Sequence, residues 1–179
     1  MLSTKRAIIL GIIPGVVVVI IILIAAFYTK EVYTEVDIQA PKQRIWQTII
    51  NFSDFHRWDP FMNQAGGEIR IGAPVYIHLQ PPNSDGMNID VVITKIDPNH
   101  ELRWLGRFAG IPRLFDGEHI FTIEPIGNNN VNHTRFIQRE IFNGILVPFF
   151  TYQLDTNYKP GFDAMNHALK TEAERPLSR

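Results

Sequence analysis

The residues of this sequence with the greatest potential for chemistry are a histidine, a glutamine and a glutamate on two predicted strands. His119 lies on the strand predicted over residues 117–126, and Gln138 and Glu140 lie on the strand predicted over residues 131–142. Side chains alternate between the two faces of a strand, and all three share their strand's apolar-rich face. A buried carboxylate beside an imidazole can act as an acid–base pair, because burial and a charged neighbour both shift pKa values. His119 and Glu140 are therefore candidate catalytic residues.

Two other interpretations of these residues remain open. A few polar groups inside an apolar pocket can orient a bound molecule. Alternatively, the three side chains satisfy one another as a buried polar cluster, which is the usual arrangement of buried polar groups. For the first interpretation we predict ligand contacts from the residues of three strands that face the same interior: Trp104, His119, Phe121, Phe136, Gln138 and Glu140.

Other catalytic and cofactor-binding signatures are absent from the sequence. There is no cysteine, which excludes disulfides, thiolate metal ligands and cysteine nucleophiles. None of the four serines lies in a nucleophile elbow. No Gly-Lys pair of a phosphate-binding loop and no G-x-G-x-x-G motif occurs. The six histidines show no paired spacing typical of a metal site. We therefore predict no cofactor and no metal.

The elements that position these residues follow an α+β order. Alternating residues over 31–40 predict a strand, and two short helices follow at 41–51 and 53–58. A helix from residue 144 to about 174 ends the chain, and Pro160-Gly161 should kink or interrupt it. Because short turns separate the strands between, they should be antiparallel neighbours that bury one face against the final helix. These six strands are predicted at 68–71, 75–80, 87–96, 101–108, 117–126 and 131–142.

The first thirty residues predict a membrane anchor. Residues 7–28 contain no charged residue and no histidine. As a helix they would extend about 33 Å, enough to cross a hydrocarbon core of about 30 Å. A cleaved signal peptide is the alternative, but its apolar run is usually about 7–15 residues and ends in a small-x-small site. We therefore predict a tail (1–6), a transmembrane helix (7–28), one domain (31–175) and a short tail (176–179).

Charge limits the partners of the domain and its side of the membrane. After residue 29 the chain carries 15 basic and 18 acidic side chains, a net charge of −3. Nucleic acid is therefore not an expected partner, since phosphate binding needs a basic surface. Lys5 and Arg6 favour an external domain on a bacterial cytoplasmic membrane, although Lys30, Lys42 and Arg44 nearly cancel this bias. The sequence does not indicate a protein partner.

Several segments, in this order and spacing, resemble the helix-grip superfamily of START domains, pollen-allergen-like proteins and polyketide cyclases, often called SRPBCC. The resemblance runs from about Tyr33 to Glu174. It implies a curved sheet wrapped around a long helix, with a hydrophobic cavity between them, and it implies no universal catalytic residue. The segments are Ala40-Pro41 with Ile45-Trp46, Phe55-His56-Arg57-Trp58-Asp59-Pro60, Leu102-Arg103-Trp104-Leu105-Gly106, Gly117-Glu118-His119-Ile120-Phe121, Thr134 to Phe142 with Gly144, and Met165 to Lys170 before Glu174.

Three functions follow from these observations as hypotheses. The first is a membrane-tethered binding protein for an apolar small molecule or lipid held between the sheet and the final helix. The second is an enzyme of the cyclase or aromatase type that uses His119 and Glu140 for proton transfer. The third is a structural or interaction domain whose cavity is filled by its own side chains.

Overall fold

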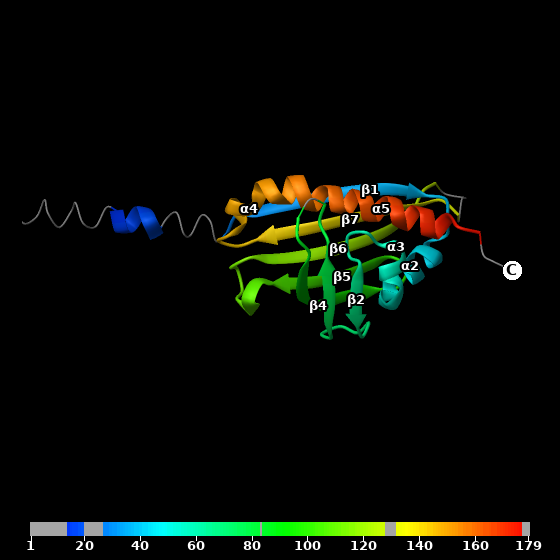
Figure 1. Ribbon diagram of the computed structural model, residues 1–179, viewed down its shortest axis with the longest axis horizontal. Helices are drawn as coiled ribbons and strands as arrows, with labels where there is room; N and C mark the ends of the chain where they lie inside the picture. The colour runs from blue at the N-terminus through cyan, green and yellow to red at the C-terminus, as the bar shows by residue number, and fades with distance from the viewer. Residues whose placement is uncertain (1–13, 20–26, 83, 128–131, 177–179) are drawn as a thin grey trace, which may run out of the picture.

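A seven-stranded antiparallel sheet and a long C-terminal helix form the two layers of the protein (Figure 1). The computed structural model describes residues 14–19, 27–82, 84–127 and 132–176. The strand order is β1-β7-β6-β5-β4-β3-β2, so the first and last strands of the chain are neighbours. The strands are β1 (Thr29–Ile38), β2 (Gln64–Gly67), β3 (Pro74–Leu79), β4 (Met87–Asp97), β5 (Glu101–Arg107), β6 (Asp116–Pro125) and β7 (Thr134–Asn143).

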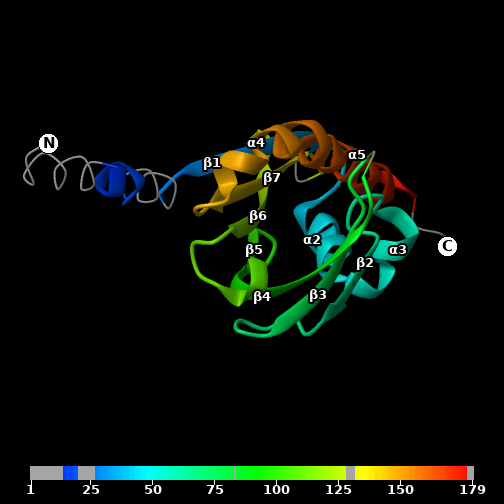
Figure 2. The same ribbon diagram turned by 60° about the vertical axis from the view of Figure 1, so that its left-hand side comes forward.

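This order follows from the lengths of the connections. The strands from β2 to β7 are joined by short links, so each pairs antiparallel with the next. β1 pairs with β7 along its whole length, from Thr29 opposite Asn143 to Ile38 opposite Thr134. The sheet curves toward α5 (Lys159–Glu174), which lies across β1 and β7 (Figures 1 and 2).

The short helices between β1 and β2 cover one end of the space between sheet and α5. They are α2 (Lys42–Ile50), η1 (Phe52–Asp54) and α3 (Phe55–Trp58). Pro41 directly precedes α2, where its missing N–H removes no hydrogen bond. The buried residues of α2 recur at helical spacing and are Ile45, Trp46 and Ile49.

The C-terminal helix is continuous, although its geometry changes along its length. α4 (Val147–Gln153) leads into a π-helical segment, η3 (Leu154–Tyr158), and then into α5. The helix is therefore not interrupted at Pro160-Gly161, and its change from α to π geometry lies directly before this pair, in η3. Pro160 lies in the first turn of α5, and the wider π turn directly before it accommodates the residue that lacks an N–H donor. A Cβ at Gly161 would overlap the Phe61 ring, so the glycine allows this close approach.

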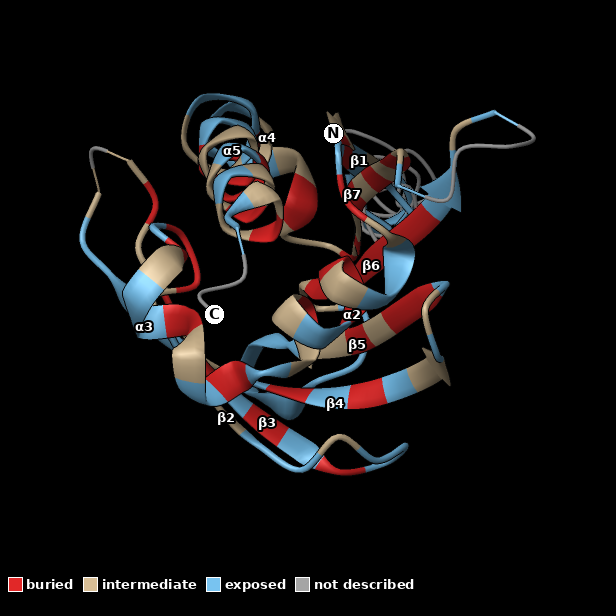
Figure 3. Cartoon of the chain, turned by 90° about the vertical axis from the view of Figure 1, so that its right-hand side faces the viewer, coloured by how far each residue is buried: buried red, intermediate tan, exposed pale blue. Residues whose placement is uncertain are grey.

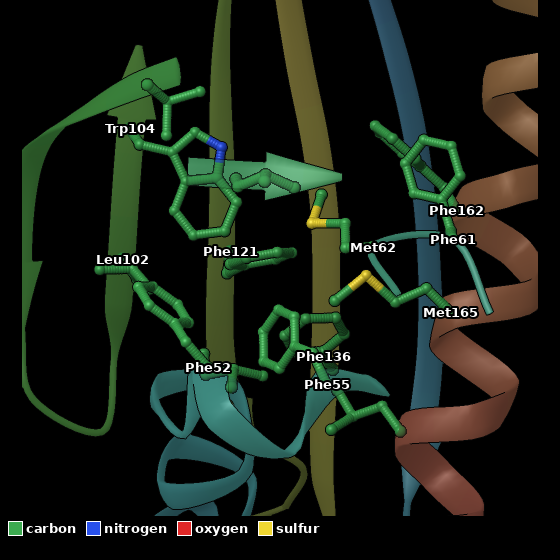
Figure 4. Close-up of a cluster of buried hydrophobic side chains, with 14 of the residues drawn as sticks. Phe52, Phe55, Phe61, Met62, Leu102, Trp104, Phe121, Phe136, Phe162 and Met165 are labelled. Carbon is green, nitrogen blue, oxygen red and sulfur yellow. The ribbon is translucent and has the colours of Figure 1, made fainter. Parts of the chain in front are cut away.

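The core lies between the concave face of the sheet and α5. Burial alternates along the strands, as the bands of buried and exposed residues show in Figure 3. Aromatic rings from β5, β6 and β7 meet side chains from α5 and from the short helices (Figure 4). Phe55, Phe121, Phe136 and Phe162 each have 0% of their surface exposed. The α+β architecture, the seven-stranded antiparallel sheet and the long C-terminal helix are confirmed.

One predicted strand is wrong. Residues 68–71 lie in a turn region, and the strand that begins the antiparallel run is β2 (Gln64–Gly67). A Gly-Gly pair is typical of a turn, so Gly66 and Gly67 give no sequence signal for a strand. A Cβ at Gly67 would come within 2.7 Å of the Pro74 carbonyl oxygen, so the glycine is what allows the close pairing with β3.

The predicted membrane anchor lies mostly outside the described residues. Of residues 7–28, the structure describes 14–19, which are helical and exposed, and 27–28. In the described part of the chain, no helix is both long enough and apolar enough to cross a membrane. The predicted tail over residues 1–6 also lies outside the described residues, as does most of the tail over 176–179.

Candidate functional site

The predicted ligand-binding residues come together on the concave face of the sheet. Trp104 of β5 lies opposite His119 of β6, and His119 lies opposite Glu140 of β7. Phe121 lies opposite Gln138 in the same two strands. The sheet register therefore places these residues in adjacent rows beneath the C-terminal helix.

The three polar side chains form a continuous chain of contacts. His119 Nδ1 lies 3.2 Å from Glu140 Oε2, and His119 Nε2 lies 3.2 Å from Gln138 Nε2. A carboxylate only accepts, and an amide nitrogen only donates. The imidazole therefore donates from Nδ1 to Glu140 and accepts at Nε2 from Gln138. Gln138 Nε2 also lies 3.3 Å from Met165 Sδ of α5.

Aromatic rings hold the imidazole of His119 on several sides. The Trp104 ring stacks on it, with centroids 5.2 Å apart and planes 30° apart. Phe121 lies 4.5 Å from it and Phe162 of α5 lies 5.0 Å from it, centroid to centroid. Contacts from both layers fix the orientation of the ring, which directs Nδ1 toward Glu140.

The cavity implied by the family resemblance is closed at these residues. Trp104 and His119 are each 2% exposed, and Phe121, Phe136 and Gln138 are 0% exposed. A side chain with no exposure borders no space that could hold a water molecule, so these residues pack against one another. A hollow of about 370 Å³ does occur elsewhere, between the short helices and β2. Its lining residues are Phe52, Ser53, His56, Gln64 and Ala65.

One atom of this polar cluster is buried without a hydrogen-bond partner, and it is among several such atoms in the described part of the protein. Gln138 Oε1 has none among the described residues, although the side chain is fully buried. Leaving such an acceptor unpaired costs about 1–3 kcal/mol. Asn166 of α5 also has an unpaired buried oxygen, while its amide nitrogen donates to Thr34 Oγ1 at 2.8 Å. The interior therefore offers acceptor atoms to a molecule that carries a donor.

The chain of polar groups reaches the surface at Glu140, whose side chain is 14% exposed. Burial raises the pKa of the nearby Tyr158 phenol, and the charge of Glu140 raises it further, so the phenol stays neutral. The Tyr158 hydroxyl lies 3.3 Å from Met87 Sδ at the start of β4. A Cβ at Gly117 would overlap Glu140 Oε1, so this glycine leaves room for the carboxylate. We call Met87, Gly117, Glu140 and Tyr158 the mouth of the site.

Sequence reasoning missed three of the four mouth residues. Gly117 shares its strand face with His119, so its position beside the site could have been found from alternation. In the sequence, Tyr158 fits the spacing of the final helix and has no other signal. It lies in the π segment, whose wider turn changes the direction of the following side chains, and the sequence pattern gave no signal of that segment. Among the described residues, no three His, Asp or Glu side chains gather as metal ligands.

The curved antiparallel sheet around a long helix, with polar groups on the concave face, defines a protein of the helix-grip class. The chain belongs to the polyketide cyclase/dehydrase and lipid transport family, whose family model matches residues 29–174. Comparison with curated protein sequences gives no match.

Solved structures share this fold at low sequence identity. The Zhui aromatase/cyclase from Streptomyces sp. R1128 has a TM-score of 0.66 and 13% identity, over 83% of this chain and 95% of that chain. Norcoclaurine synthase from Thalictrum flavum, in complex with dopamine and hydroxybenzaldehyde, has a TM-score of 0.65 and 12% identity, over 86% and 91% of the two chains. The di-domain ARO/CYC protein BexL has a TM-score of 0.65 and 12% identity, over 83% of this chain and 51% of its own.

Proposed function

We propose that this protein binds an apolar small molecule or lipid between its sheet and α5, and that residues 7–28 hold it at a membrane. One observation carries the proposal: contacts lead from the partly exposed carboxylate of Glu140, through His119, to the fully buried and unpaired oxygen of Gln138. An unpaired acceptor at the inner end of a polar chain suits a ligand with one donor group. Membership of a family described by polyketide cyclisation and lipid transport supports the same ligand class.

Binding in this position requires side chains to move, because the interior is packed. Met165 contacts Gln138 directly, and Met62 lies in the same cluster (Figure 4). Methionine side chains are unbranched and adapt readily to new surroundings. A guest that displaces them regains about 25 cal/mol for each Å² of apolar surface it removes from water. A ligand hydroxyl or amide N–H would then donate to Gln138 Oε1.

The position of the first strand supports tethering. β1 begins at Thr29, directly after the predicted span, so the domain would lie at the membrane surface. A tether of this kind raises the effective concentration of the domain next to lipid cargo. The basic residues before the span favour the external side of the membrane.

A cyclase-type enzyme is the second candidate, favoured by the contact between His119 and Glu140. A general base must reach the substrate proton at about 2.6–3.2 Å. The unprotonated nitrogen of the imidazole is Nε2, and it already accepts a hydrogen bond from the Gln138 amide. Catalysis by His119 would therefore require the Gln138 amide to turn away. A ligand that donates to Gln138 Oε1 would leave this amide in contact with His119.

Native mass spectrometry of the full chain, purified in detergent, tests the binding proposal. We expect the wild type to carry an adduct of discrete mass that organic solvent releases. Gln138→Leu should lose most of this adduct, since leucine suits the apolar surroundings but offers no acceptor. Gln43→Leu, at an exposed position of α2, should keep it.

Three results would contradict the proposal. A wild type without an adduct, both as purified and after incubation with lipid vesicles, would favour a structural domain with a filled interior. An adduct held equally by Gln138→Leu would show that the amide is not a ligand contact. If the wild type chemically converts the identified compound and Glu140→Gln does not, the protein is an enzyme rather than a binding protein.

A further inference from the structure

Apolar side chains gather on the surface at one end of the molecule. α4 exposes Phe149 (73%) and Tyr152 (74%), and the connection between β5 and β6 exposes Phe108 (62%) and Ile111 (52%). Phe27, just before β1, is 67% exposed. α4, this connection and the start of β1 lie at the same end of the molecule in Figures 1 and 2. We call these five residues the aromatic end.

Hydrogen bonds join the three segments that carry the aromatic end. The N–H of Ile145 donates to the Arg113 carbonyl at 2.9 Å, and the N–H of Leu146 donates to the Leu114 carbonyl at 3.0 Å. The N–H of Gly144 donates to the Tyr28 carbonyl at 3.4 Å. The segments are thus held as one surface rather than as three independent loops.

Helix α4 carries no charge, and a basic side chain lies beside Phe27. Residues 144–153 contain no charged side chain. The guanidinium of Arg113 is exposed and lies 4.8 Å from the centroid of the Phe27 ring, as a cation–π contact. Exposed aromatic rings beside a basic side chain are typical of surfaces that lie in the headgroup region of a bilayer.

A row of rings connects the aromatic end to the mouth of the site. Phe150 of α4 contacts Phe115 with centroids 5.5 Å apart, and Phe115 contacts Phe142 at the same distance. Phe142 then contacts Tyr158, with centroids 5.9 Å apart. An apolar path therefore runs from the exposed surface to the residues that surround Glu140.

We propose that the aromatic end docks onto the lipid bilayer, with its rings at headgroup depth, so that the mouth opens toward the membrane. The occupant is a bilayer because the apolar segment over residues 7–28 ends at this surface, beside Phe27 and Tyr28. The inference rests on the proposed function for its purpose, since docking would give lipid-like cargo a route to the site. The docking itself is a separate physical claim.

The absence of native cysteine allows a direct test in the full chain. Single variants Phe108→Cys and Phe149→Cys are labelled with an environment-sensitive fluorophore and reconstituted into vesicles of phosphatidylcholine and phosphatidylglycerol. Ile71→Cys, at a position 58% exposed in the turn before β3, is the matched control. We expect blue-shifted emission at positions 108 and 149, with loss of intensity when nitroxide-labelled lipid is included, and neither effect at position 71.

The outcomes separate docking from ligand binding. Water-like emission at all three positions would overturn the docking proposal, whether or not the wild type carries its adduct. A blue shift without quenching by nitroxide lipid would also overturn it, and would indicate a second copy of the chain on this surface. Lipid quenching at positions 108 and 149, in a protein that never carries an adduct, would support docking while the proposed ligand function fails.

Discussion

The two ends of the space between sheet and α5 differ in how they are closed. At one end, Phe52 and Phe55 of the short helices pack edge-to-face with centroids 5.5 Å apart, and Phe52 packs in the same way on Trp104 at 6.2 Å. At the other end, Tyr158 and Met87 meet over the partly exposed Glu140. The first end is filled by rigid rings, and the second is covered by a methionine and by a π-helical segment.

This difference indicates which end supports the fold and which end can open. Rigid rings in close contact leave large cavities when they are truncated, so their removal is expensive. π-helical turns occur frequently at functional sites, and methionine adapts to different packing partners. We therefore expect stability to depend mainly on the closed end, and ligand access to depend on the mouth.

Truncating a ring at the closed end should have the largest effect. Phe55→Ala removes a side chain with 0% exposure from the closed end. The expected loss in free energy of unfolding is about 3–5 kcal/mol. Met87→Ala, at the mouth, removes a side chain that is 46% exposed and should lower the free energy of unfolding by about 1 kcal/mol or less. Denaturant unfolding of the full chain in detergent measures both, and equal losses would contradict the difference between the two ends.

The closed end should also respond to pH, because a carboxyl is buried there. Asp59 follows α3 and is 3% exposed. Its Oδ1 accepts hydrogen bonds from the backbone N–H groups of Phe61 and Met62, at 2.8 and 2.9 Å. Burial raises the pKa of this carboxyl to about 7. Between about pH 4 and pH 7 the folded state therefore keeps a proton that the unfolded state, with a pKa of about 3.9, has released.

Stability should consequently fall as pH rises through this window, by up to about 4 kcal/mol at 1.36 kcal/mol per pKa unit. Asp59→Asn keeps an acceptor for both N–H groups but does not ionise, so the variant should lack this part of the pH dependence. Unfolding free energies of both proteins at several pH values measure the difference. Parallel pH profiles would show that Asp59 does not carry a raised pKa.

Two glycines give a matched comparison of the packed interior under α5 with the mouth. A Cβ at Gly161 would overlap the Phe61 ring, which is itself packed against Phe162 and Tyr158. Overpacking of this kind costs about 1–3 kcal/mol, against a helix-propensity gain of up to about 1 kcal/mol for alanine. A Cβ at Gly117 would overlap only the end of the Glu140 side chain and press on Phe142.

We therefore expect Gly161→Ala to lower the free energy of unfolding more than Gly117→Ala does. The reason is that a packed ring has nowhere to move, whereas a partly exposed carboxylate can turn toward solvent. Thermal and denaturant unfolding of the two variants provide the measurement. A larger loss for Gly117→Ala would mean that the mouth is as tightly packed as the interior around Phe61.

The sequence predicted the fold and the faces of the strands, because alternation and turn residues are local signals. It assigned Trp104, His119, Phe121, Phe136, Gln138 and Glu140 to one interior, and the strand register brings their positions together. β2 was misplaced because a Gly-Gly pair is read as a break, although close pairing with β3 is what requires glycine.

The closed interior and the mouth could not be predicted in the same way. Whether a helix-grip interior is open depends on how rings from α5 and the short helices meet those of the sheet, and these contacts join distant parts of the chain. The spacing of Tyr158 fits an α-helix, so the sequence does not distinguish it from the other apolar positions of the final helix. The π segment that contains it lies directly before Pro160, and the spacing of apolar residues does not distinguish π from α geometry there.

The smallest predicted effect concerns the proton of His119. Glu140 and Gln138 contact opposite nitrogens of the imidazole, which assigns its proton to Nδ1. In Gly117→Ala the new methyl group displaces the carboxylate, so Nδ1 loses its acceptor and the tautomer protonated at Nε2 should gain population. In Glu140→Gln an amide oxygen can still accept from Nδ1, and the original tautomer should persist.

Long-range proton–nitrogen correlation spectra of the full chain, with ¹⁵N-labelled histidine, distinguish the two tautomers. The signal of His119 is assigned by its absence in His119→Gln. If Gly117→Ala leaves the ring protonated at Nδ1, the tautomer is set by Gln138 alone and Glu140 is not part of a working pair. If the tautomer changes while stability stays near that of the wild type, the mouth can alter the site chemistry without disturbing the closed end, as a ligand that displaces the Glu140 carboxylate would.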